Sequence, residues 1–266
     1  MAHADAPEPL AMPAIPHAMG LDIGGSGVKA AVVDVGTGEL LSERVRSKTP
    51  RPASPDAVLA TARKLGRRLE WSGPLGCGFP GSFRGGKVDR APNLDPSWGG
   101  YDLAGELRRA FGVDRVAICN DADAAGLAEI RLGAGRGVAG TVVLLTLGTG
   151  IGTSVFRDGV LMPGTELGHL EMDGVEAETL AAESARKHNG WSWKRWAVNL
   201  DRYLARLEYL LGVDLFILGG GASKKADKFI GALEKVPCEV VVAQMGNLAG
   251  IVGAALMVAE RVEPAV

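Results

Sequence analysis

The fold of this chain is decided by the stretch Asp22-Ile23-Gly24-Gly25-Ser26-Gly27-Val28-Lys29. The apolar residues 18–23 predict a buried strand before its glycines, and residues 29–35 predict a second strand after them. Glycine has no Cβ, so a turn of this kind exposes backbone N–H groups that can form a nest for an anion. A single turn of this type is more simply a tight connection, so its meaning depends on the rest of the chain.

The same pattern returns in the second half of the chain. Leu21-Asp22-Ile23-Gly24 aligns with Leu145-Thr146-Leu147-Gly148, and the second turn runs through Gly148-Thr149-Gly150-Ile151-Gly152. Each copy predicts strand, glycine turn, strand, turn and strand, which indicates an internal duplication and two similar lobes. A third run, Gly219-Gly220-Gly221, follows an apolar strand predicted at 215–218. Three such turns, each leaving an apolar strand, favour phosphate binding over simple connections.

Composition narrows the class of protein. Lys and Arg number 29 against 31 Asp and Glu, a balance that argues against a dedicated nucleic-acid binder. No apolar run reaches the ~18 residues of a membrane span, and Cys77, Cys119 and Cys238 form no CxxC pair. We expect these cysteines to be buried thiols of a reducing compartment, so the cytoplasm is the expected location.

Two common nucleotide-binding motifs are absent from the sequence. The residues after Gly24 continue into a strand and not a helix, which speaks against a Rossmann dinucleotide site, and no P-loop motif GxxxxGK[ST] occurs. Helices alternate with strands, so the fold class is α/β. The expected helices lie at 55–71, 101–111, 121–132, 177–188, 193–211, 226–235 and 248–262, and a third strand of the first hairpin is expected at 39–48.

The motifs resemble those of a known family. The first two glycine turns look like the phosphate motifs of the actin/hexokinase/Hsp70 superfamily, and Gly219-Gly220-Gly221 looks like its later glycine motif near the nucleotide. Asn120-Asp121-Ala122-Asp123-Ala124 and Glu166-Leu167-Gly168-His169 are similar to motifs of the ROK family of sugar kinases and repressors. The segment Gly190-Trp191-Ser192-Trp193, with Trp196, resembles the polyphosphate glucokinases within that family.

The resemblance covers residues 18–262 and implies a fold. This is a two-lobe actin-like ATPase (ribonuclease H-like) fold with duplicated β-hairpin phosphate motifs and a cleft between the lobes. We expect a disordered tail at 1–17, a small lobe at 18–119 plus 248–264, and a large lobe at 120–247.

Asp121 stands where a predicted strand meets a predicted helix. From spacing alone it is equally well explained as a helix N-cap, and Asn120 fits the cap as well. Phosphoryl transfer to a hydroxyl needs positioning, charge neutralisation and a carboxylate that accepts the hydroxyl proton. The resemblance implies that Asp121 is this general base and that Asn120 binds a sugar hydroxyl.

The resemblance also implies further sugar ligands. Glu166 and His169 are three residues apart and can point the same way on one turn. Glu171 is implied by its family position, and Gly81 and Asn93 resemble sugar-facing loop residues, although both also fit ordinary turns.

The phosphate and metal residues follow from the same resemblance. Asp22 is expected to hold Mg²⁺ through water, and Lys29 either faces phosphate or is a strand-edge lysine. Zinc is not expected, because the cysteine-rich motif that follows Glu-x-Gly-His in many ROK kinases is missing between His169 and His188. The phosphate- or nucleotide-binding residues are expected to be Asp22, Gly24, Gly25, Ser26, Gly27, Lys29, Thr149, Gly150, Gly219 and Gly220.

The expected activity is that of a glucokinase. It would transfer a phosphoryl group from polyphosphate, ATP or both to the 6-hydroxyl of glucose, with no nucleic-acid or membrane partner, as a homodimer. Lys224, Lys225 and Lys228 beside the third glycine run suit a polyphosphate chain, provided that Lys224 and Lys228 share a helix face. Three alternatives stay open: an ATP-dependent kinase for fructose, mannose or N-acetylmannosamine, a non-catalytic sugar sensor, and a repressor, which the short Pro-rich segment before the first turn disfavours.

Overall fold

The computed structural model describes residues 15–260, which form two compact units. Residues 15–128 and 247–260 form the amino-terminal unit, and Glu129–Gly246 form the central unit. The sequence predicts a boundary at residue 120 instead. Residues 120–128 belong to the amino-terminal unit because α3 (Asp121–Leu132) packs there on α8 (Ala249–Ala259), where Gly253 leaves no room for a Cβ against the Ala124 carbonyl.

The amino-terminal unit is built on a five-stranded sheet of order β3-β2-β1-β4-β7. The first three strands are antiparallel, whereas β1, β4 and β7 run parallel. β1, β2 and β4 are buried along nearly their whole length, which is typical of strands that are covered on both faces. The strands are β1 (His17–Ile23), β2 (Gly27–Asp34), β3 (Val45–Lys48), β4 (Leu75–Phe79) and β7 (Val116–Asn120), and a separate hairpin consists of β5 (Ser82–Arg84) and β6 (Lys87–Arg90).

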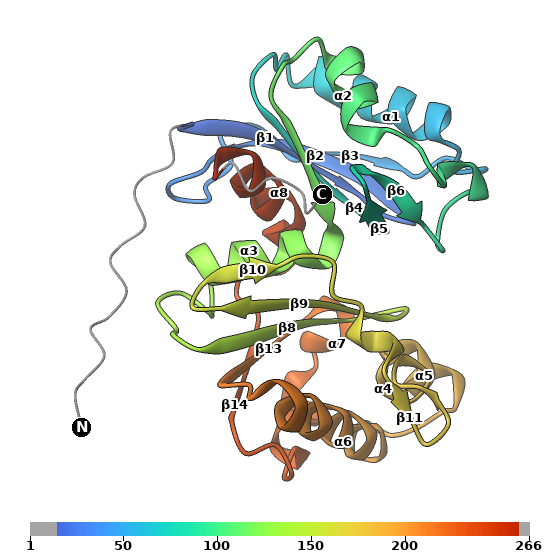
Figure 1. Cartoon of the computed structure of the whole chain (residues 1–266), viewed down its shortest axis with the longest axis vertical. Helices are drawn as coiled ribbons and strands as arrows, with labels where there is room; N and C mark the ends of the chain where they lie inside the picture. Colours follow the sequence, from blue (N-terminus) through green and yellow to red (C-terminus); the bar gives the residue numbers. More distant parts are fainter. Residues whose placement is uncertain (1–14, 261–266) are drawn as a thin grey trace. The chain divides into compact units, whose positions relative to one another are not determined.

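Helices cover both faces of this sheet. One face packs against α1 (Pro55–Arg68) and α2 (Leu103–Phe111), and the other against α8. The carboxy-terminal α8 (red) therefore lies beside β1 (blue), although the two elements are far apart in the sequence (Figure 1). Gly20 and Gly76 permit this approach, because a Cβ on either would collide with backbone carbonyls of α8.

The central unit repeats the same topology. Its sheet has the order β10-β9-β8-β13-β14, with an antiparallel hairpin β8–β9–β10 followed by parallel β13 and β14. The matching order of the two sheets confirms the predicted duplication. The strands are β8 (Thr141–Leu147), β9 (Ile151–Arg157), β10 (Val160–Met162), β13 (Leu215–Gly219) and β14 (Glu239–Val242).

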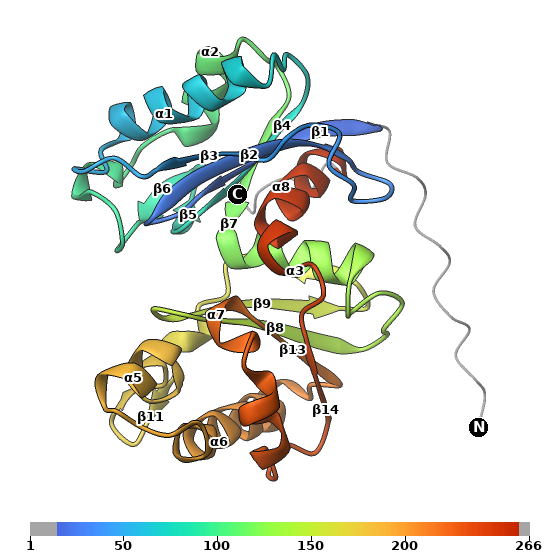
Figure 2. The same cartoon turned by 180° about the vertical axis from the view of Figure 1, so that it is seen from behind.

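A helical layer covers one face of the central sheet (Figure 2). Trp196 is fully buried there and donates Nε1–H to the carbonyls of Ala181 and Ala182, so this tryptophan is core packing, as expected. Its ring lies edge-on to Phe229, with the ring centroids 4.9 Å apart. The helices are α4 (Glu178–Ala181), α5 (Glu183–His188), α6 (Trp193–Leu211) and α7 (Gly220–Ser223).

Three predicted elements differ from the structure. The helix expected at 177–188 is divided into α4 and α5, because Ala182 between them has an extended backbone. The helix expected at 226–235 is replaced by two short 3-10 turns, Ala226–Lys228 and Ile230–Ala232. The buried Asp201 carboxylate accepts the N–H of Lys235 at 3.0 Å, so that donor is bonded to a side chain and not to a helical carbonyl. The strand expected at 39–48 is shortened to β3, preceded by an isolated bridge between Val33 and Leu40.

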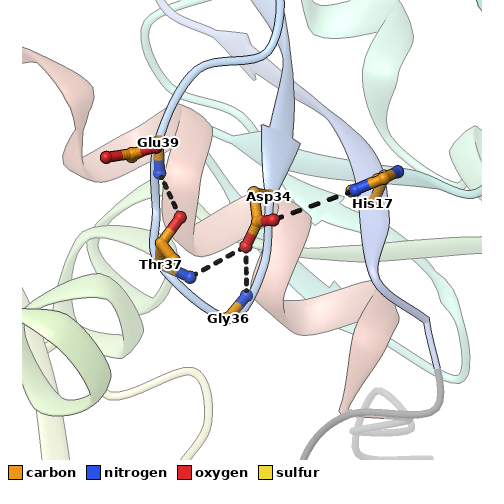
Figure 3. A network of polar contacts seen from close by, with 5 residues as sticks. All are labelled: His17, Asp34, Gly36, Thr37 and Glu39. Carbon is orange, nitrogen blue, oxygen red and sulfur yellow. Dashed lines mark hydrogen bonds and ion pairs between the residues drawn. The ribbon is translucent and has the colours of Figure 1, made fainter.

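The start of the described chain also differs from the expected tail at 1–17. Residues 1–14 lie outside the described residues, but Ile15 is buried and β1 begins at His17. His17 Nε2 lies 3.8 Å from the Asp34 carboxylate, which accepts the N–H groups of Gly36 and Thr37 in the β2 turn (Figure 3). The hydrogen bond from Thr37 N–H lowers the pKa of Asp34.

Two of the three cysteines are buried, as predicted. Cys77 and Cys119 are buried and unpaired, and burial raises the pKa of both thiols. Cys238 is partly buried. Among residues 15–260, no helix combines the length and the apolar character that crossing a bilayer requires.

Candidate functional site

The first glycine turn connects β1 to β2 and is closed tightly. Gly24 N–H donates to the Gly27 carbonyl at 3.0 Å. The buried Thr49 hydroxyl donates to the Gly24 carbonyl, which ties the turn to the segment after β3. Asn93 lies against the same turn, because a Cβ on Gly25 would be 3.7 Å from its Cβ. The turn is therefore held in one shape from two sides.

Cationic side chains surround this first turn. Lys29 Nζ lies 2.7 Å from the Asp22 carboxylate, directly across the β1–β2 pair. The Arg46 guanidinium lies over Gly27, where an added Cβ would be 3.1 Å from its Nε. Arg51 donates to the Gly25 carbonyl at 3.2 Å. A phosphate at this turn would lie beside several positive charges.

The second glycine turn connects β8 to β9 and has different neighbours. Gly148 N–H donates to the Gly150 carbonyl at 3.1 Å, which closes the turn. The Glu178 carboxylate accepts the N–H of Ile151 at 3.1 Å, and the Ser184 hydroxyl donates to the Thr149 carbonyl. A carboxylate therefore occupies an N–H group that the predicted nest would offer to an anion.

The third glycine run lies against the second turn. Gly219 ends β13, and Gly220 has φ of +78°, a backbone conformation that glycine adopts without strain. A Cβ on Gly220 would be 2.6 Å from backbone atoms of Leu147, so this run packs on the strand end that precedes the second turn. These two predicted phosphate motifs therefore form one region of the central unit.

Asn120, the last residue of β7, caps α3. Its Oδ1 accepts the N–H groups of Ala122 at 2.7 Å and Asp123 at 3.4 Å, and its Nδ2 donates to the Gly81 carbonyl at 3.2 Å. The structure thus answers the question that spacing left open: the cap is Asn120. The second N–H of its amide is left to donate to a ligand. Asp121 follows as the first residue of α3, half-buried.

The Glu-Leu-Gly-His segment forms a 3-10 turn, Leu167–His169, in the central unit. Gly168 packs so closely on the Ile151 carbonyl that a Cβ would not fit, and the Thr153 hydroxyl accepts the N–H of Leu167 at 3.1 Å. The turn is therefore fixed to β9, the strand that leaves the second glycine turn. His169 follows at its end, exposed by about half.

His169 belongs to an acidic group. Its Nδ1 lies 3.2 Å from the Glu176 carboxylate, and one ligand atom each of His169, Glu176 and Glu178 lie within 4.8 Å of one another. A carboxylate at Nδ1 fixes the orientation of an imidazole and leaves Nε2 for a ligand. Glu171 is exposed on β11 (Glu171–Met172), opposite Glu176 on β12 (Val175–Glu176).

The predicted site residues therefore divide between the units. Asp22, the first glycine turn, Gly81, Asn93, Asn120 and Asp121 belong to the amino-terminal unit, and Glu166, His169, Glu171 and the other two glycine motifs belong to the central unit. Sequence reasoning missed Arg46, Arg51, Glu176 and Glu178. Only Arg46 carried a signal, the alternation of Arg44, Arg46 and Lys48 along the strand predicted at 39–48.

Comparisons with known proteins identify the family of the chain. The family model described as "ROK family" matches residues 18–182. A polyphosphate glucokinase of Mycobacterium tuberculosis is 48% identical over 90% of either chain. The crystal structure of an inorganic polyphosphate/ATP-glucomannokinase from Arthrobacter sp. strain KM superposes with a TM-score of 0.87 at 44% identity, covering 93% of this chain and all of that one. A ROK glucokinase from Streptomyces griseus, at 24% identity and a TM-score of 0.76 over 91% of this chain and 99% of that one, shares the fold. The fold is the predicted actin-like ATPase fold, and the chain belongs to the ROK family.

Proposed function

We propose that this protein is a glucokinase that transfers a phosphoryl group from polyphosphate, ATP or both to the 6-hydroxyl of glucose. The observation that carries this proposal is the 48% identity to a polyphosphate glucokinase along 90% of either chain. The first glycine turn supports it, because its backbone and the nearby cations Arg46, Arg51 and Lys29 suit a donor with several phosphate groups. The name of the Arthrobacter relative favours mannose as a second sugar.

Asp121 is the proposed general base. It would accept the proton of the glucose 6-hydroxyl as the oxygen attacks phosphorus. Because Asn120 supplies the cap of α3, capping does not require the Asp121 carboxylate. The first turn of a helix also favours the ionised form of an acid, which keeps the carboxylate ready to accept a proton.

Glu166 and His169 are the proposed main sugar ligands of the central unit, with Glu171 as a further one. Glu176 at Nδ1 of His169 supports this role, since it holds the imidazole in one orientation. With Nδ1–H donated to Glu176, Nε2 of the neutral imidazole is an acceptor, so Nε2 and the Glu166 carboxylate can each accept a hydrogen bond from a sugar hydroxyl. Asn120, Asn93 and the Gly81 backbone are the proposed sugar contacts of the amino-terminal unit.

Asp22 is the proposed residue for Mg²⁺, bound through water. Its carboxylate is only 14% exposed and lies beside the first glycine turn, so it fits a hydrated cation that keeps most of its own waters. The metal would neutralise charge on the donor phosphates when bound. Lys29, already 2.7 Å from Asp22, would supply a second positive charge toward the same donor.

A coupled assay tests the proposal. Glucose, mannose, fructose and N-acetylmannosamine are each offered with ATP and with polyphosphate, with Mg²⁺ and after its removal by a chelator. We expect the highest kcat/KM with glucose, turnover with polyphosphate, and loss of activity without Mg²⁺. The purified protein should contain no zinc by metal analysis. Turnover of glucose with ATP but never with polyphosphate would make the protein an ATP glucokinase, and a preference for another hexose would overturn the sugar assignment.

A further inference from the structure

A row of charged side chains crosses the sheet of the amino-terminal unit. Asp22 on β1 is paired with Lys29 on β2, and Lys29 is paired with Arg46 on β3. Directly paired residues point to the same side of a sheet, so the row reads carboxylate, ammonium and guanidinium on one face. Lys48 is two residues after Arg46 and therefore shares that face.

This face is open where the cations lie. Asp22 faces α8, since a Cβ on Gly250 would be 3.0 Å from its carboxylate. The helix packs on β1, β2 and β4, whereas β3 is the edge strand, and both Arg46 and Lys48 are exposed. Within residues 15–260, neither of these two side chains forms an ion pair. Their charge is therefore available to a ligand.

The open cations are continuous with the first glycine turn. Arg46 lies over Gly27, and Lys48 is paired with Gly27 across β2 and β3. Arg51 reaches the Gly25 carbonyl from the segment after β3. A ligand that places one phosphate at the turn could therefore extend along the edge strand and meet further positive charge.

We propose that Arg46, Lys48 and Arg51 form a binding arm for the part of a polyphosphate chain beyond the phosphates held at the first glycine turn. This inference rests on the proposed use of polyphosphate and assigns residues to it. The arm suits a linear polyanion, because side chains two residues apart on a strand recur every ~6.6 Å along a straight line. A nucleotide ends its charge after three phosphates and continues as an uncharged ribose and base. Arg46 and Lys48 are thus residues that set donor specificity.

The test is the double variant Arg46→Gln/Lys48→Gln, which removes two charges and retains much of the side-chain length. Arg51 is left in place because it bonds to the turn itself. Exposed charge pairs contribute modestly, so we expect KM for long-chain polyphosphate to rise about 5- to 20-fold, and more than KM for ATP. In the variant, polyphosphate KM should depend less on chain length than in the wild type. It should also rise less steeply when salt is added.

The matched control is Arg63→Gln/Arg67→Gln. These two exposed arginines belong to α1, which packs on the opposite face of the same sheet. Long-chain polyphosphate KM should stay within about twofold of the wild type in this control. If both double variants behave alike while the wild type uses polyphosphate, the arm is refuted and the proposed function stands.

Equilibrium binding distinguishes failure of the arm from failure of the proposed use of polyphosphate in turnover. Titration calorimetry with long-chain polyphosphate, without sugar, measures the arm even if no turnover occurs. Binding that weakens in Arg46→Gln/Lys48→Gln but not in the control supports the arm in either case, whereas equal binding in all three proteins overturns it. A single-stranded oligonucleotide that binds as tightly as polyphosphate, and loses affinity equally in the variant, would show a general polyanion surface and contradict the assigned specificity.

Discussion

The two glycine hairpins share one topology and differ in the chemistry around them. In both units an antiparallel hairpin is followed by two parallel strands, and a glycine turn connects the first two strands. The first turn is surrounded by Arg46, Arg51 and Lys29, whereas the second is contacted by the carboxylate of Glu178 and the hydroxyl of Ser184. A repeated backbone therefore does not imply a repeated ligand.

The third strands of the two hairpins show the same contrast. β3 carries the exposed cations Arg46 and Lys48, while β10 exposes Val160 and Met162, at 70% and 56% of their surface. Positive charge at the first hairpin favours a donor with many phosphates. A carboxylate at the second, next to His169 and Glu176, favours a neutral ligand rich in hydroxyl groups. The hairpins are thus expected to serve different substrates, and each prediction below tests that division.

The largest effect is expected from Asp121→Asn, because the chemical step is common to every donor. The amide can still bond to a hydroxyl but cannot take its proton, so kcat should fall by about 10²- to 10⁴-fold. The fall should be equal with ATP and with polyphosphate. Steady-state kinetics with both donors measures it, and titration calorimetry shows whether glucose still binds.

Asn120→Asp is the informative companion variant, since an aspartate also caps helices. It should retain the cap of α3, but it removes the amide that donates to the Gly81 carbonyl and to the proposed sugar hydroxyl, so glucose KM should rise while kcat falls less than in Asp121→Asn. A large loss of kcat with only one donor in Asp121→Asn would mean that Asp121 acts on the donor and is not the base.

The hairpins themselves were predictable from sequence because their signals are local. Apolar strands on both sides of Gly24–Gly27 and of Gly148–Gly152 define the turns without any tertiary information. The helix that starts at Asp121 was predicted for the same reason, by acidic residues in its first turn and periodic apolar residues.

The features that the sequence did not predict depend on contacts between residues that are distant in the sequence. The Glu178 carboxylate accepts the N–H of Ile151, 27 positions away. The Asp201 carboxylate accepts the N–H of Lys235, 34 positions away, at the end of the helix expected at 226–235. The strand expected at 39–48 loses its first half partly because the Ser42 hydroxyl, and not a strand partner, accepts the N–H of Val32. Side-chain capture of backbone groups has no periodic pattern to read.

A smaller effect is expected from Glu178→Gln. The amide oxygen can still accept the N–H of Ile151, so the second turn should keep its shape while the charge beside His169 is lost. Hydrogen bonds to a charged group contribute about 1.5–3 kcal/mol, which corresponds to roughly a 10- to 100-fold higher glucose KM. Donor KM should change less, as measured by kinetics with each substrate varied in turn.

The matched comparison is Glu171→Gln, since the sequence favours Glu171 as a sugar ligand and the structure places a carboxylate oxygen of Glu178 within 4.8 Å of a His169 ring nitrogen. Glu171 is exposed on β11, so its replacement should raise glucose KM less than Glu178→Gln does. If Glu171→Gln raises glucose KM more than Glu178→Gln does, Glu171 is the sugar ligand and Glu178 is not. A rise in donor KM alone in Glu178→Gln would show that the second turn serves the donor and would remove the division between the hairpins.

The smallest effect is expected from Lys224→Ala/Lys228→Ala. The sequence favours these lysines as polyphosphate ligands only if a helix brings them onto one face. In the structure α7 ends at Ser223, and Lys228 lies in a separate 3-10 turn. Two exposed, strongly hydrated ammonium groups without a common helix face should contribute little, so polyphosphate KM should rise by less than about threefold. Kinetics beside Arg46→Gln/Lys48→Gln gives the comparison directly. If the lysine variant has the larger effect, polyphosphate follows the third glycine run of the central unit, and the cations of β3 lose their assigned role.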